Sequence, residues 1–127
     1  VSTLKSIISQ IRTVGANDSV GYSRKFMVKK EMRIATIPIG YADGIRRAWG
    51  NEKGFVSINN QEATILGNVC MDMLMVDVTH INCAERDEVI IFGENPHVTE
   101  IAKICNTIPY EILTSISQRV KRIFYKN

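Results

Sequence analysis

The sequence predicts a mainly β domain, a closed Greek-key-like β-barrel with two short helices near the C-terminus, with a β-sandwich as the alternative architecture. Three observations favour this class. Short apolar segments rich in β-branched residues recur over the first three quarters of the chain, separated by turns that contain Gly, Asn or Asp. Two helical patterns follow from residue 99 onward. No repeat or low-complexity linker interrupts the sequence, so residues 1–127 are expected to form a single domain.

The N-terminal third contains one ambiguous segment and one clear strand. Apolar residues between positions 3 and 14 fit a helical period, whereas the Ser, Thr and β-branched residues among them fit a strand, so both remain open. Residues 15–18 have turn chemistry, and Gly21 gives the backbone freedom to bend just before Tyr22. Alternation over residues 32–39 predicts a strand, in which Pro38 indicates an edge or an end.

The middle of the chain is expected to hold a hairpin and the central strand. Residues 55–58 and 63–66 flank a polar turn at Asn59–Glu62, which is typical of a β-hairpin. The ten residues Val69–Val78 contain neither Gly nor Pro and are apolar enough for a strand that is covered on both faces. Asp72 would then lie near the start of a buried strand and would need a partner, unless this is a core strand with Met filler and a frayed acidic end.

The last third changes in character. Residues 88–93 predict a further strand, and a turn containing Pro96 follows it. Residues 99–105 and 110–116 place apolar side chains at helical spacing, so two short helices are expected there. Residues 120–125 predict a closing strand.

Composition and charge narrow the class of protein. The net charge of +3 comes from interleaved acids and bases without a long basic stripe, so nucleic-acid binding is not indicated. No apolar run approaches the roughly 18 residues that a membrane span needs. Three cysteines without a CxxC spacing favour a reduced, cytoplasmic setting. The first residues lack the pattern of a signal peptide, and because the chain does not begin with Met, a fragment, an expressed domain or a processed product is expected.

Few side chains suggest chemistry on local pattern alone. His80 and His97 each have acidic or Cys neighbours three residues away, but neither lies in a helical pattern that would gather ligands, so no metal site is expected. Cys70 is expected to be a buried structural thiol, because no motif places a His beside it. The segment Gly40–Gly44 is by itself as consistent with a turn as with a site.

Four motifs nevertheless occur in a recognisable order. They are Val20-Gly21-Tyr22, the run Ile37–Gly44, Cys70-Met71-Asp72 and Thr107–Glu111. Together they resemble the C-terminal domain of alanine racemase, and the resemblance extends over nearly the whole chain, including the closing segment at residues 119–122. Four motifs at compatible spacing are far more specific than any single one.

The resemblance implies an enzyme of two domains, in which an N-terminal TIM barrel carries pyridoxal 5′-phosphate on a lysine and a β-rich domain follows. The barrel is absent from this chain. In such enzymes two subunits pair head to tail, and each active site lies between one barrel and the β domain of the partner. The implied reaction interconverts L- and D-alanine for peptidoglycan synthesis, the implied partners are an amino-acid substrate and the barrels of both subunits, and this chain alone is expected to be inactive. The alternative is a non-catalytic binding or dimerisation module that keeps this fold.

Two tyrosines match the family's catalytic and cofactor-binding positions. Tyr22 matches the base on the face of the cofactor opposite the lysine, and racemisation needs two bases because the proton leaves one face of a planar carbanion and returns to the other. A free tyrosine has a pKa of about 10, so positive charge from the barrel must stabilise its phenolate. Tyr110 matches the tyrosine that hydrogen-bonds the cofactor phosphate in its own subunit, whereas Tyr22 serves the neighbouring subunit.

Four other residues match the substrate corridor. Tyr41 matches the tyrosine that narrows the entrance, and Met71 matches the residue whose backbone amide helps to hold the substrate carboxylate. Asp72 matches the acidic residue beside that amide, and Arg47 matches the positively charged residue of the entrance loop.

Two further positions belong to the same corridor. Asp43 matches the acid of the entrance loop, although a turn-stabilising role is expected rather than a chemical one. Asn68 departs from the family pattern, because many members carry Arg two residues before the Cys of the Cys-Met-Asp motif. This change alters the charge balance expected at the corridor.

Overall fold

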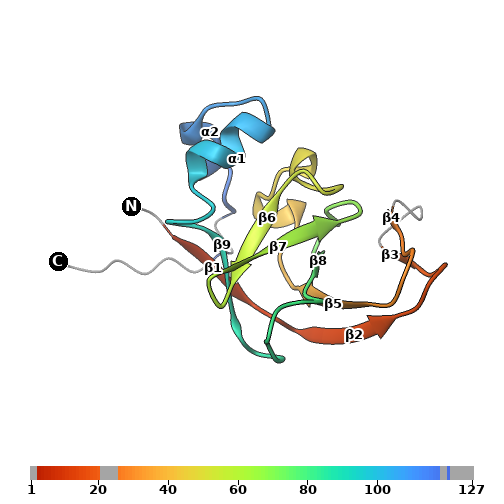
Figure 1. Cartoon of the computed structure of the whole chain (residues 1–127). Helices are drawn as coiled ribbons and strands as arrows, with labels where there is room; N and C mark the ends of the chain where they lie inside the picture. The colour runs from red at the N-terminus through yellow and green to blue at the C-terminus, as the bar shows by residue number, and fades with distance from the viewer. Residues whose placement is uncertain (1–2, 21–25, 118–119, 121–127) are drawn as a thin grey trace.

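The computed structural model describes residues 3–20, 26–117 and 120 and has a mainly β architecture (Figure 1). The strands are β1 (Leu4–Ile7), β2 (Gln10–Val14), β3 (Ser19–Val20), β4 (Phe26–Met27), β5 (Met32–Ile37), β6 (Phe55–Ile58), β7 (Gln61–Leu66), β8 (Leu74–Asp77) and β9 (Glu88–Phe92). The helical elements are the 3₁₀ turns η2 (Tyr41–Asp43) and η3 (Arg47–Trp49) and the helices α1 (Val98–Ile104) and α2 (Pro109–Thr114). The mainly β class with two late helices is confirmed.

Seven strands form one curled antiparallel sheet in the order β1-β9-β6-β7-β8-β5-β2. Its two edge strands, β1 and β2, are separated in the chain only by Ile8 and Ser9. The Ile8 amide donates to the carbonyl of Asp87 at 3.0 Å, beside β9, whereas the Ser9 amide donates to the carbonyl of Thr36 at 2.9 Å, in β5. One bent segment therefore pairs at both ends of the curled sheet, which has the form of a half-barrel.

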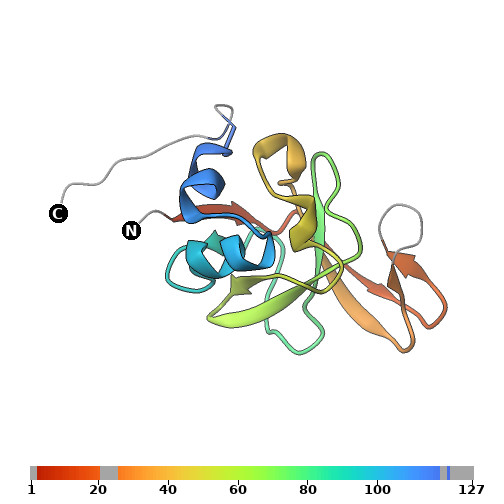
Figure 2. The same ribbon diagram turned by 90° about the horizontal axis from the view of Figure 1, so that it is seen from above.

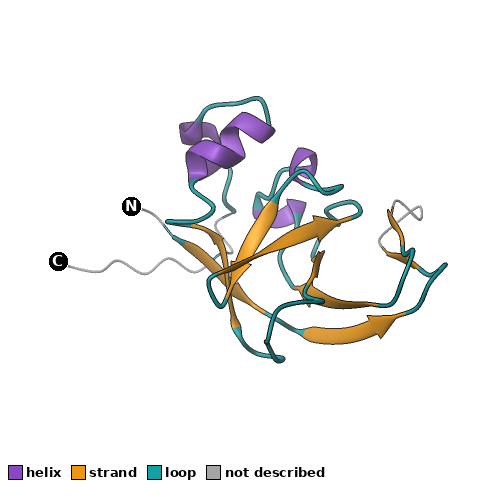
Figure 3. Ribbon diagram, viewed as in Figure 1, coloured by secondary structure: helices purple, strands orange, loops and turns teal. Residues whose placement is uncertain are grey.

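The connection between β5 and β6 gives the sheet its Greek-key order. The strands β6, β7 and β8 follow one another as antiparallel neighbours, and β8 then pairs with β5 instead of continuing outward. The long return path over residues 38–54 carries η2 and η3. In Figure 3 these 3₁₀ turns and the two helices lie on one side of the curled sheet.

Local chemistry explains where the strands begin and end. Asn59 and Asn60 adopt positive φ values of 51° and 64°, so a two-residue turn of the kind favoured in hairpins joins β6 to β7. The expected hairpin is confirmed, with a shorter turn than expected because β7 already begins at Gln61. Pro38 marks the end of β5, which lies inside the sheet between β2 and β8.

The expected single strand over residues 69–78 is wrong for its first half. Only β8 is a strand, and residues 69–73 form a turn closed by a 2.9 Å bond from the Cys70 amide to the Met73 carbonyl. The carbonyls of Cys70 and Met71 accept hydrogen bonds from η2 and not from a neighbouring strand. Asp72 is consequently exposed in this turn, and the expected buried carboxylate is also wrong.

The core explains why β8 is apolar on both of its faces. Leu74 and Val76 are fully buried in the main core, which fills the barrel, whereas Met75 packs in a second cluster on the other face with Ile34 and Leu66. Each buried side chain of this size contributes about 1.5–3 kcal/mol relative to exposure. The fully buried residues of the main core are Ile8, Ala35, Ile37, Val56, Ile58, Ala63, Ile65, Leu74, Val76, Val78, Val89 and Ile91.

The two helices form a separate layer at one end of the molecule. Helix α1 begins after His97, whose Nδ1 accepts a hydrogen bond from the Thr99 amide at 3.2 Å, and α2 begins with Pro109 at its first position. Both helices are confirmed, although α2 ends at Thr114, two residues before the expected end. Seen from above, α1 and α2 lie at the opposite end of the molecule from the paired strands β3 and β4 (Figure 2).

Two expectations on the chain ends have different outcomes. The N-terminal segment, which the pattern left open, is strand, divided into β1 and β2. The expected closing strand over residues 120–125 lies outside the described residues except for Val120. Among the described residues, no helix is long and apolar enough to cross a membrane.

Candidate functional site

The structure brings Tyr41 and Met71 together, although thirty positions separate them in the chain. Tyr41 opens η2, and its amide donates to the carbonyl of Cys70 at 2.9 Å. The next amide, that of Ala42, donates to the carbonyl of Met71 at 3.0 Å. Two consecutive backbone bonds thus join η2 to the turn at residues 69–73, and we call this contact the η2–Met71 junction.

Gly40 makes this junction possible. A Cβ atom at position 40 would lie 2.2 Å from the carbonyl oxygen of Cys70 and 2.5 Å from that of Met71, far inside van der Waals contact. The φ of Gly40 is −150°, which any residue adopts, so this glycine serves close backbone approach and not an unusual backbone angle.

Both residues of the junction present groups to solvent. Tyr41 and Met71 are 45% and 50% exposed, so both residues reach the solvent at the junction. Within the part of the chain that the structure describes, the Met71 amide donates no hydrogen bond, so it is available to an acceptor from outside. Asp72 follows it in the same exposed turn.

Arg47 adds positive charge beside Tyr41. Its guanidinium carbon lies 5.7 Å from the centroid of the Tyr41 ring, within the range of a cation–π contact. Arg47 is exposed at the start of η3, so its charge faces solvent next to the junction. Tyr41, Arg47 and Met71 together form a surface that can attract and bind a small carboxylate.

Asn68 ties the turn after η3 to the strand end before Cys70. The Asn51 side-chain amide donates to Oδ1 of Asn68 at 3.0 Å, and the Asn51 backbone amide donates to the carbonyl of Gly67 at 2.7 Å. A neutral pair therefore occupies the position where the family resemblance suggests an arginine. The sequence reasoning missed Asn51, because nothing in its local pattern distinguishes it from an ordinary loop residue.

Tyr110 lies on a different element, at the second position of α2. Its side chain is 71% exposed, and its hydroxyl has no hydrogen-bond partner among the described residues. A free phenolic hydroxyl at an exposed helix start can donate to an anionic group. Tyr22, the expected base, lies outside the described residues, in the segment that joins β3 to β4.

The remaining candidates have structural explanations. Cys70 is 4% exposed, which confirms the expected buried thiol, and His97 caps α1. Burial raises the pKa of the Cys83 and Cys105 thiols, which favours their neutral form at neutral pH. No group of three His, Cys, Asp or Glu side chains within residues 3–20, 26–117 and 120 could hold a metal ion.

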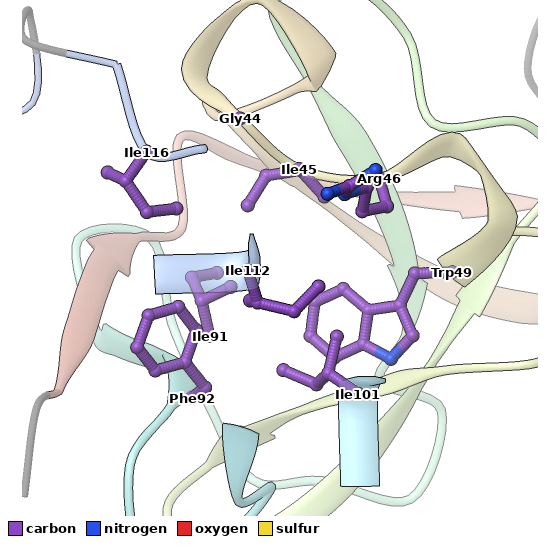
Figure 4. A pocket seen from close by; sticks show the side chains of 9 residues that line it. All are labelled: Gly44, Ile45, Arg46, Trp49, Ile91, Phe92, Ile101, Ile112 and Ile116. Carbon is purple, nitrogen blue, oxygen red and sulfur yellow. The ribbon is translucent and has the colours of Figure 1, made fainter. Parts of the chain in front are cut away.

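A small cavity between the curled β-sheet and the helices is part of the packing of this domain. Figure 4 shows Ile45 and Trp49 from the β5–β6 connection facing Ile101 of α1 and Ile112 of α2. Its volume is about 10 Å³, which is roughly the space that one water molecule needs. This cavity is therefore too small to bind a substrate.

Comparison with known proteins identifies related sequences over nearly the whole chain. The family model described as alanine racemase, C-terminal domain, matches residues 1–124. A protein of Helicobacter pylori named alanine racemase is 41% identical over 128 residues, which cover 98% of this chain and 34% of that protein. An alanine racemase of Alteromonas mediterranea is 44% identical over 122 residues, or 95% of this chain and 34% of its own length. The chain thus spans about a third of the length of these relatives.

Solved structures show the same fold. The alanine racemase of Bartonella henselae, with covalently bound pyridoxal phosphate, matches with a TM-score of 0.92 and 36% identity over 97% of this chain and 34% of that one. The alanine racemase of Clostridium difficile 630 in complex with cycloserine matches with a TM-score of 0.87 and 40% identity over 93% of this chain and 32% of that one.

Proposed function

We propose that this chain is the β-rich domain of a pyridoxal-phosphate-dependent alanine racemase. The reason is that the chain belongs to the family of alanine racemase C-terminal domains. The single observation that carries the proposal is the family match over residues 1–124. The full-length protein would be a cytoplasmic enzyme that interconverts L- and D-alanine and supplies the D-isomer for peptidoglycan. The chain covers about a third of its relatives' length, and the remaining two thirds of the full-length protein would contain the TIM barrel and its lysine.

In the proposed arrangement two subunits pair, and one domain of this kind contributes to two active sites. Helix α2, which carries Tyr110, lies at the opposite end of the molecule from β3 and β4 (Figure 2). Tyr22 follows β3 by two residues in the chain. The family resemblance assigns Tyr110 to the site of its own subunit, and it assigns Tyr22 to the site of the partner.

The described residues fit the groups that the cofactor and the substrate present. When bound, pyridoxal 5′-phosphate supplies an electron sink that makes the Cα proton of alanine removable. Tyr110, with an exposed hydroxyl that has no partner among the described residues, would donate to its phosphate. The available amide of Met71 would donate to the substrate carboxylate, with Asp72 beside it.

The other residues of the chain would control the proton and access to the site. Tyr22 would take the Cα proton on one face and return it there in the reverse direction, while the barrel lysine serves the other face. Tyr41 would narrow the entrance, and Arg47, stacked at 5.7 Å from its ring, would attract the carboxylate.

The test is racemisation of alanine by the product of the full reading frame. With pyridoxal 5′-phosphate, we expect turnover of L- to D-alanine and the reverse, and Tyr22→Phe should reduce it by about 10²- to 10⁴-fold in both directions while cofactor binding survives. The 127-residue chain alone should show no turnover. Turnover within a few-fold of wild type in Tyr22→Phe would reject Tyr22 as the base.

Two other results would reject the larger proposal. The first is a borohydride-trapped stoichiometric cofactor adduct on one lysine of this chain, together with turnover by the chain alone. The second is a reading frame that encodes no barrel with a lysine, which would favour the non-catalytic dimerisation module.

A further inference from the structure

We infer that Asp43 is a positioning residue for the substrate entrance, because its carboxylate holds the turn that sets Tyr41 against Met71. The inference rests on the proposed function and goes beyond it, since it assigns to an acid of the entrance loop a role in geometry and none in proton transfer. It follows from three features of the η2 turn.

The first feature is a reciprocal pair of hydrogen bonds between Asp43 and Gly40. The Gly40 amide donates to Oδ2 of Asp43 at 3.0 Å, and the Asp43 amide donates back to the carbonyl of Gly40 at 3.0 Å. The side chain of Asp43 is only 7% exposed. A buried amide that loses its acceptor costs about 1–3 kcal/mol, so the carboxylate fixes the residue immediately before Tyr41.

The second feature is that the turn is held between two other backbone segments. On the Gly40 side it meets the carbonyls of Cys70 and Met71 at the η2–Met71 junction. On the other side Gly44 adopts φ 105°, and a Cβ there would lie 2.3 Å from the carbonyl oxygen of Ser115. The Ser117 amide also donates to the Asp43 carbonyl at 3.0 Å. The two glycines of the Gly-Tyr-Ala-Asp-Gly motif thus serve two close approaches, and Asp43 closes the turn between them.

The third feature is a comparison within the molecule. The same reciprocal pair occurs at Gly15–Asp18, where the amide-to-Oδ2 distance is 2.9 Å, and at Ala84–Asp87, where it is also 2.9 Å. Asp18 is exposed and Asp87 is half-buried. Among the described residues, neither of these two turns makes a hydrogen bond to Tyr41 or Met71. The chain therefore contains matched acids with the same local geometry, of which only Asp43 adjoins the proposed entrance.

The experiment compares Asp43→Ala with Asp87→Ala in the full-length protein. Loss of the Asp43 acceptor should let Tyr41 and the Met71 amide shift. Because the Met71 amide would bind the substrate carboxylate equally in the ground state and in the transition state, this shift should act mainly on KM. We expect the KM for alanine to rise about tenfold in Asp43→Ala, with kcat within about threefold, and both constants to stay within about twofold of wild type in Asp87→Ala. Equal KM values in the two variants would overturn the inference.

Amide hydrogen exchange supplies a readout that does not require activity. The amides of Tyr41 and Ala42, which bond across the junction, should exchange faster in Asp43→Ala and at the wild-type rate in Asp87→Ala. Unchanged exchange in Asp43→Ala would also overturn the inference. A wild-type protein without racemase turnover would instead refute the proposed function, while exchange still decides whether Asp43 holds the junction.

A second pair of variants applies where Asp43→Ala does not fold. Asp43→Asn keeps an oxygen acceptor for the Gly40 amide but loses the charge, and Asp87→Asn is its match. We expect a rise in KM of about two- to threefold for Asp43→Asn and none for Asp87→Asn. No difference between these two variants would count against the inference in the same way.

Discussion

Replacing Gly40 by alanine tests whether the η2–Met71 junction depends on close backbone approach. The added methyl group would lie 2.2 Å from the Cys70 carbonyl oxygen and 2.5 Å from that of Met71, whereas ordinary contact begins near 3.4 Å. Both neighbours are backbone atoms, which cannot rotate away as a side chain can. One of the two segments must therefore move by about 1 Å.

The structure gives the size of the effect. A shift of this size removes the bonds from the Tyr41 amide to Cys70 and from the Ala42 amide to Met71, which are 2.9 and 3.0 Å long. Each bond contributes about 1 kcal/mol, and forced overpacking costs a further ~1–3 kcal/mol. Because φ at Gly40 is −150°, alanine adds no cost from the backbone angle. We expect Gly40→Ala to lower the free energy of unfolding by about 3–5 kcal/mol.

Urea unfolding of the 127-residue chain measures this change, and Gly15→Ala is the matched control. A methyl group at position 15 would meet only Oδ2 of Asp18 at 3.7 Å, which is an ordinary contact. The control should change the free energy of unfolding by less than about 1 kcal/mol in either direction. If both variants unfold at the same urea concentration, the reasoning about the junction is refuted.

Three further substitutions separate site roles from structural ones. Asp72→Asn should be tolerated by the fold, because the exposed amide keeps most of the volume of the carboxylate, but it should lower kcat/KM in the full-length enzyme through the charge at the carboxylate pocket. Unchanged kinetics would remove Asp72 from the site. Tyr110→Phe removes a hydroxyl that would donate to a charged phosphate, so the cofactor Kd measured by titration should rise about tenfold or more, and an unaltered Kd would contradict this role. Leu74→Ala opens a cavity at a fully buried position of β8 and should cost about 2–5 kcal/mol in urea unfolding, whereas a loss below about 1 kcal/mol would show that the core can collapse around it.

Local chemistry in the sequence was enough to predict many elements. The hairpin between β6 and β7 was predicted from its polar turn, although the structure shortens that turn to Asn59 and Asn60, which both adopt positive φ. The start of α2 follows from Pro109. The end of β5 follows from Pro38, which has no amide to donate. The four motifs also identified the family, because their residues, order and spacing can be read directly from the sequence.

The tertiary structure alone decided where two segments change partners. Residues 3–14 were compatible with either a helix or a strand. The segment changes its pairing partner at Ile8 and Ser9, between β1 and β2, and the spacing of its apolar residues does not indicate this change. Residues 69–73 read as strand because Val, Cys and Met are apolar, yet the acceptor carbonyls there bond to η2, which lies about thirty residues earlier. A backbone hydrogen bond carries no signal in the side chains of its partners, so the site that these bonds build could be recognised only in the folded chain.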